Sequence, residues 1–154
     1  MALPSALPSL GVREAITDAL YRCVIGLDTA DVALFDSAFT QDASFDLNGK
    51  VLDGLNAIHT GCYDFIAKLD TTHFITNIRV DVKDGESKAY VTASALAQHY
   101  RPQQGREPGA TRLMTGSLYF LDCVKDDKDG LWKVTHWKLK SIWTEGDWGV
   151  MTGN

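Results

Sequence analysis

The sequence is poor in the features that staple small domains or attract nucleic acid. It has only three cysteines, and Cys23, Cys62 and Cys123 lie far apart inside apolar segments, which excludes a disulfide-stapled miniprotein and favours buried thiols in a reducing compartment. Its 15 Lys and Arg residues against 20 Asp and Glu residues give a net charge of -5, so the positive excess that binds a phosphate backbone is missing. No nucleic-acid partner is expected.

Long hydrophobic runs and linkers are also missing. No stretch approaches about 18 consecutive apolar residues, so we expect no membrane span. The first ten residues hold two prolines and no basic residue, which argues against a signal peptide and for a cytoplasmic protein. With 154 residues and 45% apolar composition, the chain is long enough for a core of its own. We expect one domain over 12–143, an N-terminal arm over 1–11, and a C-terminal tail over 144–154 that covers a pocket or contacts another subunit.

Two periodicities follow one another along the chain. Apolar residues at spacings of three and four predict helices over residues 12–27, 31–39 and 55–69. The Asn48-Gly49 pair predicts a hairpin before the third helix. Four long strand-like segments then follow at 73–82, 88–101, 111–124 and 131–143. Helices followed by antiparallel strands indicate an α+β fold, and strands this long must curl around the helices as a half-open cone that encloses a cavity.

Several motifs in this order resemble the SnoaL-like group of the nuclear transport factor 2-like superfamily. They are LDTAD at 27–31, FTQDA at 39–43, the Gly49 to Gly54 stretch, Thr72-His73 and DGLWKVTHW at 129–137. The resemblance spans about residues 12–142. It implies a cone-shaped α+β barrel with a strongly curved mixed or antiparallel sheet, a pocket at its open end, and assembly as a dimer or trimer. Its members include scytalone dehydratase-like enzymes, a dehydrochlorinase, polyketide cyclases and isomerases, most of which work without a cofactor.

The resemblance also implies a catalytic pair. In the dehydratase-like and dehydrochlorinase-like members, an Asp at the end of the first helix orients a His at the start of the first long strand, and these positions are Asp28 and His73 here. An imidazole titrates near neutrality, and a carboxylate on its other nitrogen fixes the tautomer and stabilises the imidazolium. The alternative is structural, with Asp28 capping a turn and His73 filling a partly buried strand start.

Strand alternation leaves the direction of His73 open. In a regular strand its side chain lies on the same face as that of Ile75. Phe74, Ile78 and Val80 form the opposite face, which is the more apolar of the two. A bulge or the curl of the strand must therefore decide which way the His73 side chain points.

Two positions depart from the pattern of these relatives. Cys23 stands where they place Tyr or Lys, and Trp137 stands where they often place Arg. Tyr21 and Lys138 are neighbours that could substitute for the missing hydroxyl or cation. Together with aromatic and polar side chains expected at the cavity, they complete the set of candidate substrate-binding residues, which comprises Tyr21, Cys23, Tyr63, His99, Tyr119, Trp137 and Lys138.

The resemblance implies a cofactor-free lyase or isomerase that acts on a secondary-metabolite intermediate. We expect His73, supported by Asp28, to remove a proton from a carbon beside an activating group of an apolar or polycyclic substrate, which then loses water, isomerises or cyclises. No set of His, Cys, Asp and Glu residues has the spacing of metal ligands, so no metal is expected. The competing class is a non-catalytic ligand-binding or assembly domain of the same fold.

Overall fold

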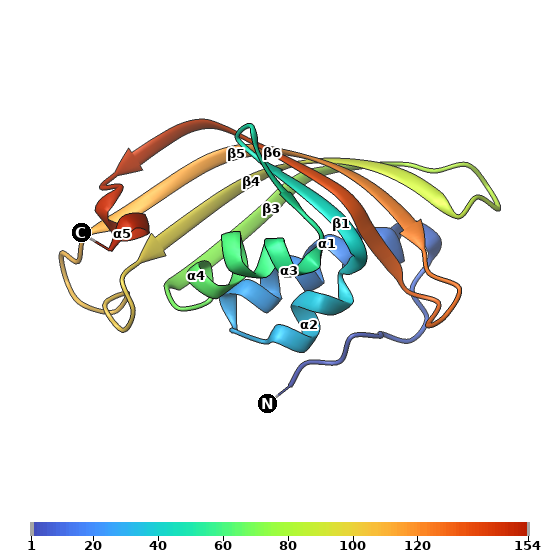
Figure 1. The fold of residues 1–154 in the computed structure, drawn as a ribbon, viewed down its shortest axis with the longest axis horizontal. Helices are drawn as coiled ribbons and strands as arrows, with labels where there is room; N and C mark the ends of the chain where they lie inside the picture. The colour runs from blue at the N-terminus through green and yellow to red at the C-terminus, as the bar shows by residue number, and fades with distance from the viewer. Residues whose placement is uncertain (1, 154) are drawn as a thin grey trace.

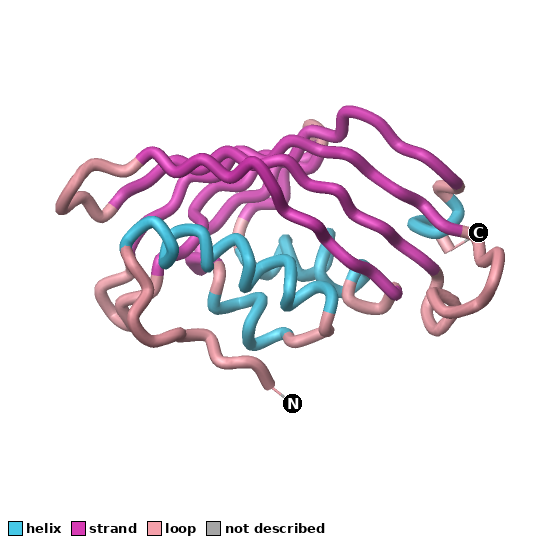
Figure 2. Tube along the Cα trace, turned by 180° about the vertical axis from the view of Figure 1, so that it is seen from behind, coloured by secondary structure: helices cyan, strands magenta, loops and turns pink. Residues whose placement is uncertain are grey.

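The computed structural model describes residues 2–153 as a strongly curved sheet that arches over a layer of helices (Figure 1). Seen from behind, the helices lie on one side of the sheet (Figure 2). The helical segments are α1 (Val12–Asp28), α2 (Val32–Ser37), α3 (Leu55–Ile58), the π-helical turn η1 (His59–Tyr63), α4 (Asp64–Ile66) and α5 (Gly149–Thr152). The strands are β1 (Phe39–Leu47), β2 (Lys50–Asp53), β3 (Asp70–Asp81), β4 (Lys88–Tyr100), β5 (Arg112–Lys125) and β6 (Trp132–Gly146).

The six strands form one mixed sheet in the order β2-β1-β6-β5-β4-β3. Only the β1–β6 pair is parallel. The α+β class and the strongly curved sheet expected from the sequence are thereby confirmed. The sheet does not close, because β2 and β3 remain its two edges. Strands of 12 to 15 residues accumulate enough twist to curl around the helices, and the result is an open cone.

Helix α1 provides the central apolar stripe of the helical layer. Its buried side chains at spacings of three and four include Ile16, Leu20, Cys23 and Leu27. The buried guanidinium of Arg22 binds the Asp18 carboxylate at 2.9 Å, the backbone carbonyl of Ser37 and, at 2.5 Å, that of Trp132. This one side chain therefore ties α1 to α2 and to the start of β6.

The helix expected over 55–69 is interrupted. A π-helical turn separates α3 from α4, and the helix ends at Ile66. The extra residue in this turn changes which side chains face inward, so Phe65 is 38% exposed while Ile66 is buried. A Cβ on Gly61 inside the turn would lie 2.5 Å from a Leu52 methyl group, so a larger residue there would have to displace the Leu52 side chain of β2.

A bulge in β3 determines the direction of His73. The pairing of β3 with β4 shifts between Thr76 and Arg79, where Asn77 has a φ of 54°. Before the bulge His73 and Ile75 are the more buried residues, and after it Ile78 and Val80 are. The extra residue thus turns both sets toward the helices, which resolves the conflict of parity in the sequence.

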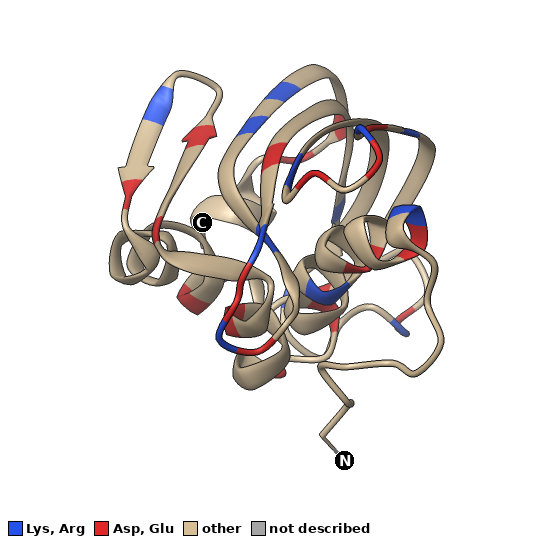
Figure 3. Cartoon of the chain, turned by 90° about the vertical axis from the view of Figure 1, so that its right-hand side faces the viewer, with Lys and Arg blue, Asp and Glu red and all other residues tan. Residues whose placement is uncertain are grey.

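The chain end folds back under the sheet. Strand β6 runs to Gly146, beyond the strand end expected at residue 143, and α5 then places Val150 in the core. Over residues 2–153, no helix is long and apolar enough to cross a membrane. Lys and Arg segments lie among Asp and Glu segments on the side drawn in Figure 3.

Candidate active site

The end of α1 and the start of β3 bring Asp28 and His73 into contact. The Nδ1 atom of His73 lies 2.6 Å from one carboxylate oxygen of Asp28, and the backbone N–H of His73 donates to the other at 2.8 Å. The Thr71 hydroxyl donates to the first oxygen at 2.7 Å. The side chains are 7% exposed for His73 and 18% for Asp28. Asp28 therefore binds both the backbone and the imidazole of His73, at the start of the edge strand β3.

These donors offset the cost of a carboxylate at a helix C-terminus, where the dipole disfavours negative charge. Burial by itself raises the pKa of Asp28, but the hydrogen bonds from His73 and Thr71 outweigh it and lower that pKa below its ordinary value. The carboxylate is thus ionised at neutral pH. Because it accepts from Nδ1–H of His73, the unprotonated nitrogen of the neutral imidazole is Nε2.

A second imidazole stands beside the first. The rings of His73 and His99 meet edge to face with centroids 5.6 Å apart. Nδ1 of His99 donates to the Leu113 carbonyl at 3.1 Å, which leaves Nε2 as an acceptor. Burial, followed by the charge of His73, lowers the pKa of His99. Among residues 2–153 neither Nε2 atom has a hydrogen-bond partner, so two acceptor nitrogens face the same region.

That region is a cavity of about 200 Å³ between the helices and the concave face of the sheet. His73 and His99 belong to its wall. Its aromatic lining residues are Phe45, Phe65, Tyr119, Trp137 and Trp148, and its other polar side chains are Asn48, Thr115, Ser117 and Ser141. No Lys, Arg, Asp or Glu lines it within the described chain. The cavity suits an apolar ring that carries a few uncharged polar groups.

The structure brings some of the sequence candidates to this cavity. His73, His99, Tyr119 and Trp137 line it, and Asp28 stands behind His73. Burial raises the pKa of Tyr119, so its phenol stays protonated.

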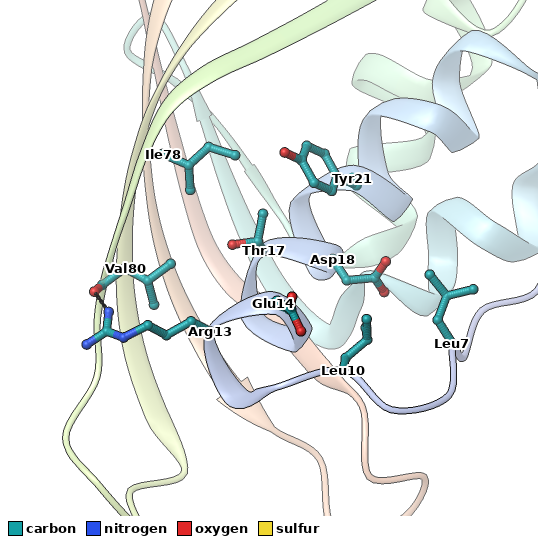
Figure 4. Close-up of a pocket in the computed structure, with 9 residues that line it drawn as sticks. All are labelled: Leu7, Leu10, Arg13, Glu14, Thr17, Asp18, Tyr21, Ile78 and Val80. Carbon is teal, nitrogen blue, oxygen red and sulfur yellow. Dashed lines mark hydrogen bonds between the residues drawn. The ribbon is translucent and has the colours of Figure 1, made fainter.

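Other candidates lie elsewhere. Cys23 is buried in the core, where burial raises its pKa, and Tyr63 packs on Phe35 with ring centroids 4.7 Å apart. Tyr21 lies on the far side of α1 from Cys23 and lines an open groove of about 570 Å³ between α1, β3 and the N-terminal arm (Figure 4). Lys138 follows the inward-facing Trp137 on β6 and is exposed. Neither Tyr21 nor Lys138 supplies a polar group to the cavity.

Sequence reasoning missed several polar residues of the cavity. Thr115 and Ser117 are two of the missed residues, and they occupy alternate positions of β5 with the expected Tyr119, between the buried Leu113 and Leu121. Their alternation was a usable signal, because small polar residues on the inward face of a strand indicate a lined cavity. Asn48 and Ser141 come from distant segments joined by two hydrogen bonds. No sequence pattern predicts that these two side chains line the cavity.

The cavity offers no cluster of metal ligands. In the described part of the chain, no group of three or more His, Cys, Asp and Glu side chains could hold a metal ion. The chemistry available from side chains is proton transfer through the two imidazoles and hydrogen bonding through hydroxyls, amide and indole.

Comparison with known proteins adds a family and a fold. A family model described as the SnoaL-like domain matches residues 8–138. Terrestric acid biosynthesis cluster protein E of Penicillium crustosum is 56% identical over 150 residues, which cover 97% of this chain and 96% of that protein.

Solved structures share the architecture. A protein provisionally named a scytalone dehydratase, from Novosphingobium aromaticivorans DSM 12444, superposes with a TM-score of 0.73 at 24% identity, covering 88% of this chain and 87% of that one. Hexachlorocyclohexane dehydrochlorinase LinA-type3 from Novosphingobium barchaimii LL02 gives a TM-score of 0.70 at 19% identity, over 90% and 91% of the two chains. At these identities the likeness concerns the fold alone.

Proposed function

Because this chain belongs to the SnoaL-like domain family, within the nuclear transport factor 2-like superfamily, we propose that it is a cofactor-free lyase or isomerase of secondary metabolism. The observation that carries the proposal is the hydrogen-bonded Asp28–His73 pair, whose imidazole lines a mostly apolar cavity. The relative from a terrestric acid biosynthesis cluster supports a small-molecule biosynthetic role.

In the proposed reaction His73 is the general base. Its Nε2 removes a proton from a carbon beside a carbonyl or similar activating group, and the electron pair of the C–H bond moves onto the oxygen of that group. Asp28 stabilises the imidazolium that forms, since it stays ionised and already accepts from Nδ1–H. A positioned base of this kind contributes roughly 10²–10⁴-fold.

The fate of the electron pair then decides the reaction class. If a hydroxyl group leaves from the neighbouring carbon, the proton on His73 goes with it and water is the product. If the same proton returns to another carbon, the result is isomerisation. If the carbon nucleophile attacks a second carbonyl of the substrate, a ring closes and the proton on His73 goes to the oxygen of that carbonyl. All three use the same first step, so that step is the one to test.

His99 is proposed as a substrate-positioning acceptor. Its Nε2 is free, its Nδ1–H is committed to the Leu113 carbonyl, and its lowered pKa keeps the ring neutral beside His73. A neutral acceptor suits a substrate hydroxyl group and adds no positive charge that would disfavour protonation of His73.

The first step is tested with 2-tetralone, an uncharged bicyclic ketone with acidic C–H bonds. We expect the protein to accelerate exchange of these protons for deuterium in D₂O, followed by proton NMR, because base removal and return of a deuteron balance without any leaving group. His73→Ala should lose at least about 10²-fold of the acceleration while remaining folded. Binding of 2-tetralone with no acceleration would instead favour a ligand-binding domain.

A further inference from the structure

A buried hydrogen-bond donor in the cavity wall has no partner. The indole Nε1 of Trp137 is sealed from solvent and is without a hydrogen bond in the described chain. Trp137 is 2% exposed and lines the cavity that holds His73 and His99. Leaving such a donor unpaired is costly, because it has given up its hydrogen bond to water and gained none in the protein, so this unpaired indole needs an explanation.

The indole is held in place by aromatic rings on several sides. Phe45 stacks on it with centroids 4.1 Å apart and planes 11° apart, and Tyr119 meets it edge to face at 5.0 Å. Phe39 stacks at 6.3 Å. The ring therefore cannot turn to find another acceptor without breaking this packing, and its N–H is oriented before any ligand arrives.

The indole also differs from the other free polar groups of the cavity. The imidazole N–H donors of His73 and His99 are already used by Asp28 and by the Leu113 carbonyl. The hydroxyl groups of the wall can donate or accept, whereas an indole N–H can only donate. Trp137 thus complements a group that has lone pairs to offer, and no cationic side chain of the described residues shares that task.

We propose that the Trp137 indole N–H binds the oxygen of the substrate's activating group, the atom on which negative charge develops when His73 removes the proton. This rests on the proposed function for the direction of the reaction, but the hydrogen bond itself does not depend on turnover. The other orphan, the Thr40 hydroxyl, is not part of the cavity wall and carries no such role. The inferred substrate is an uncharged ring compound with a carbonyl or comparable oxygen beside the acidic carbon.

The test compares two probes that differ by that oxygen, 2-tetralone and tetralin. In ¹⁵N-labelled protein, the indole signal that Trp137→Phe removes should move downfield with 2-tetralone and stay nearly still with tetralin. Trp137→Phe should weaken the binding of 2-tetralone about two- to tenfold, because a hydrogen bond to its oxygen is lost. The affinity for tetralin, which has no oxygen, should change much less. Trp132→Phe is the matched control, since Trp132 is buried on the same strand but does not line the cavity.

Each other outcome overturns the inference. If the indole signal does not move with 2-tetralone up to the solubility limit of the ketone, the hydrogen bond is excluded. If Trp137→Phe loses the same affinity for both probes, Trp137 contributes by packing alone. If Tyr119→Phe, and not Trp137→Phe, selectively loses affinity for 2-tetralone, the donor is the Tyr119 phenol. The thermal midpoint of each variant, measured in parallel, shows whether the protein is folded.

The two proposals fail separately. If 2-tetralone binds with the expected indole shift but its protons are not exchanged faster, the Trp137 hydrogen bond holds and His73 is not the base. If exchange depends on His73 but is unchanged in Trp137→Phe, the assignment of His73 as the base is supported and the role proposed for Trp137 is wrong.

Discussion

At the scale of single residues, the site depends on Asp28 making three hydrogen bonds at once. Its carboxylate accepts from the imidazole and backbone of His73 and from Thr71. A carboxylate at this helix end is unfavourable in isolation and is stabilised only by these donors. The same contacts that keep Asp28 ionised also set the tautomer of His73, so fold and proposed chemistry share one group.

Asp28→Asn should therefore leave the protein folded and remove most of its proton transfer. An amide can present the wrong hydrogen-bonding atom to Nδ1 and cannot stabilise an imidazolium, so we expect a loss on the order of 10²-fold or more in 2-tetralone exchange. Asp36→Asn is the matched control, because Asp36 binds His59 at 2.5 Å outside the cavity. Equal losses in the two variants would contradict a special role for Asp28.

His99 should make the protein less stable in mild acid. Its pKa is lowered in the folded protein, so below the ordinary value of 6.5 the unfolded chain binds a proton that the folded chain resists. This part of the free energy of unfolding is fully present above pH 6.5 and is lost as pH falls through the lowered pKa. Urea denaturation between about pH 7.5 and about pH 5.5 should show a shallower fall for His99→Gln than for the parent. Parallel pH profiles would refute the assignment.

At the scale of elements, short irregularities in long strands and helices place the cavity residues. The bulge at Asn77 turns His73 inward while keeping Ile78 and Val80 against the helices. The turn after β6 then brings Trp148 and Met151 of the α5 region to the cavity. Gly146 makes this turn with a φ of 108°, and a Cβ there would lie 2.1 Å from the Arg112 carbonyl oxygen.

Gly146→Ala should accordingly be costly. Both the backbone conformation and the contact with Arg112 oppose a side chain, so we expect a loss of about 2–3 kcal/mol in the free energy of unfolding and looser packing of α5. Gly130→Ala is the comparison, since Gly130 has a φ of 74° but open space around it, and should lose only about 1 kcal/mol. Chemical denaturation measures both, and a Gly146 variant no less stable than the Gly130 variant would show that the contact relaxes freely.

At the scale of the whole molecule, the convex face of the sheet carries an exposed apolar row. Phe74, Leu96, Gly116 and Trp143 lie opposite one another across β3, β4, β5 and β6. Phe74 is 55% exposed, Leu96 36% and Trp143 46%. A contiguous apolar row on a sheet face usually marks an interface.

We therefore expect a dimer or trimer in solution. Size-exclusion chromatography with light scattering should give a multiple of 16.9 kDa, and Leu96→Glu should reduce it toward the monomer because it buries a charge in the contact. Tyr90→Glu is a useful comparison, since Tyr90 is also exposed on β4 but lies outside this row. A monomeric parent protein at micromolar concentration would contradict the expectation.

Local patterns predicted the elements because each element's own residues decide it. The 3.6-residue period determined α1, the Asp31 side chain that accepts from the Leu34 N–H begins α2, and Asn48-Gly49, with φ values of 55° and 93°, makes the hairpin. The expected contact of Asp28 with His73 is present because it joins the ends of two such elements. The family motifs, and hence the fold, could be identified from the sequence because each motif is a short local segment.

Tertiary structure decided what depends on register and on packing between distant segments. The bulge in β3 reverses which side chains face inward after it, and the sequence showed the conflict of parity there but not its resolution. The π-helical turn adds one residue and rotates the side chains that follow it, and no local pattern marks that insertion. The groove that holds Tyr21, the position of Lys138 and the orphan indole of Trp137 follow from how the sheet curls over the helices. Sequence determines the elements because their periods are local, and only the folded chain decides the cavity because its wall is assembled from five strands and four helical segments.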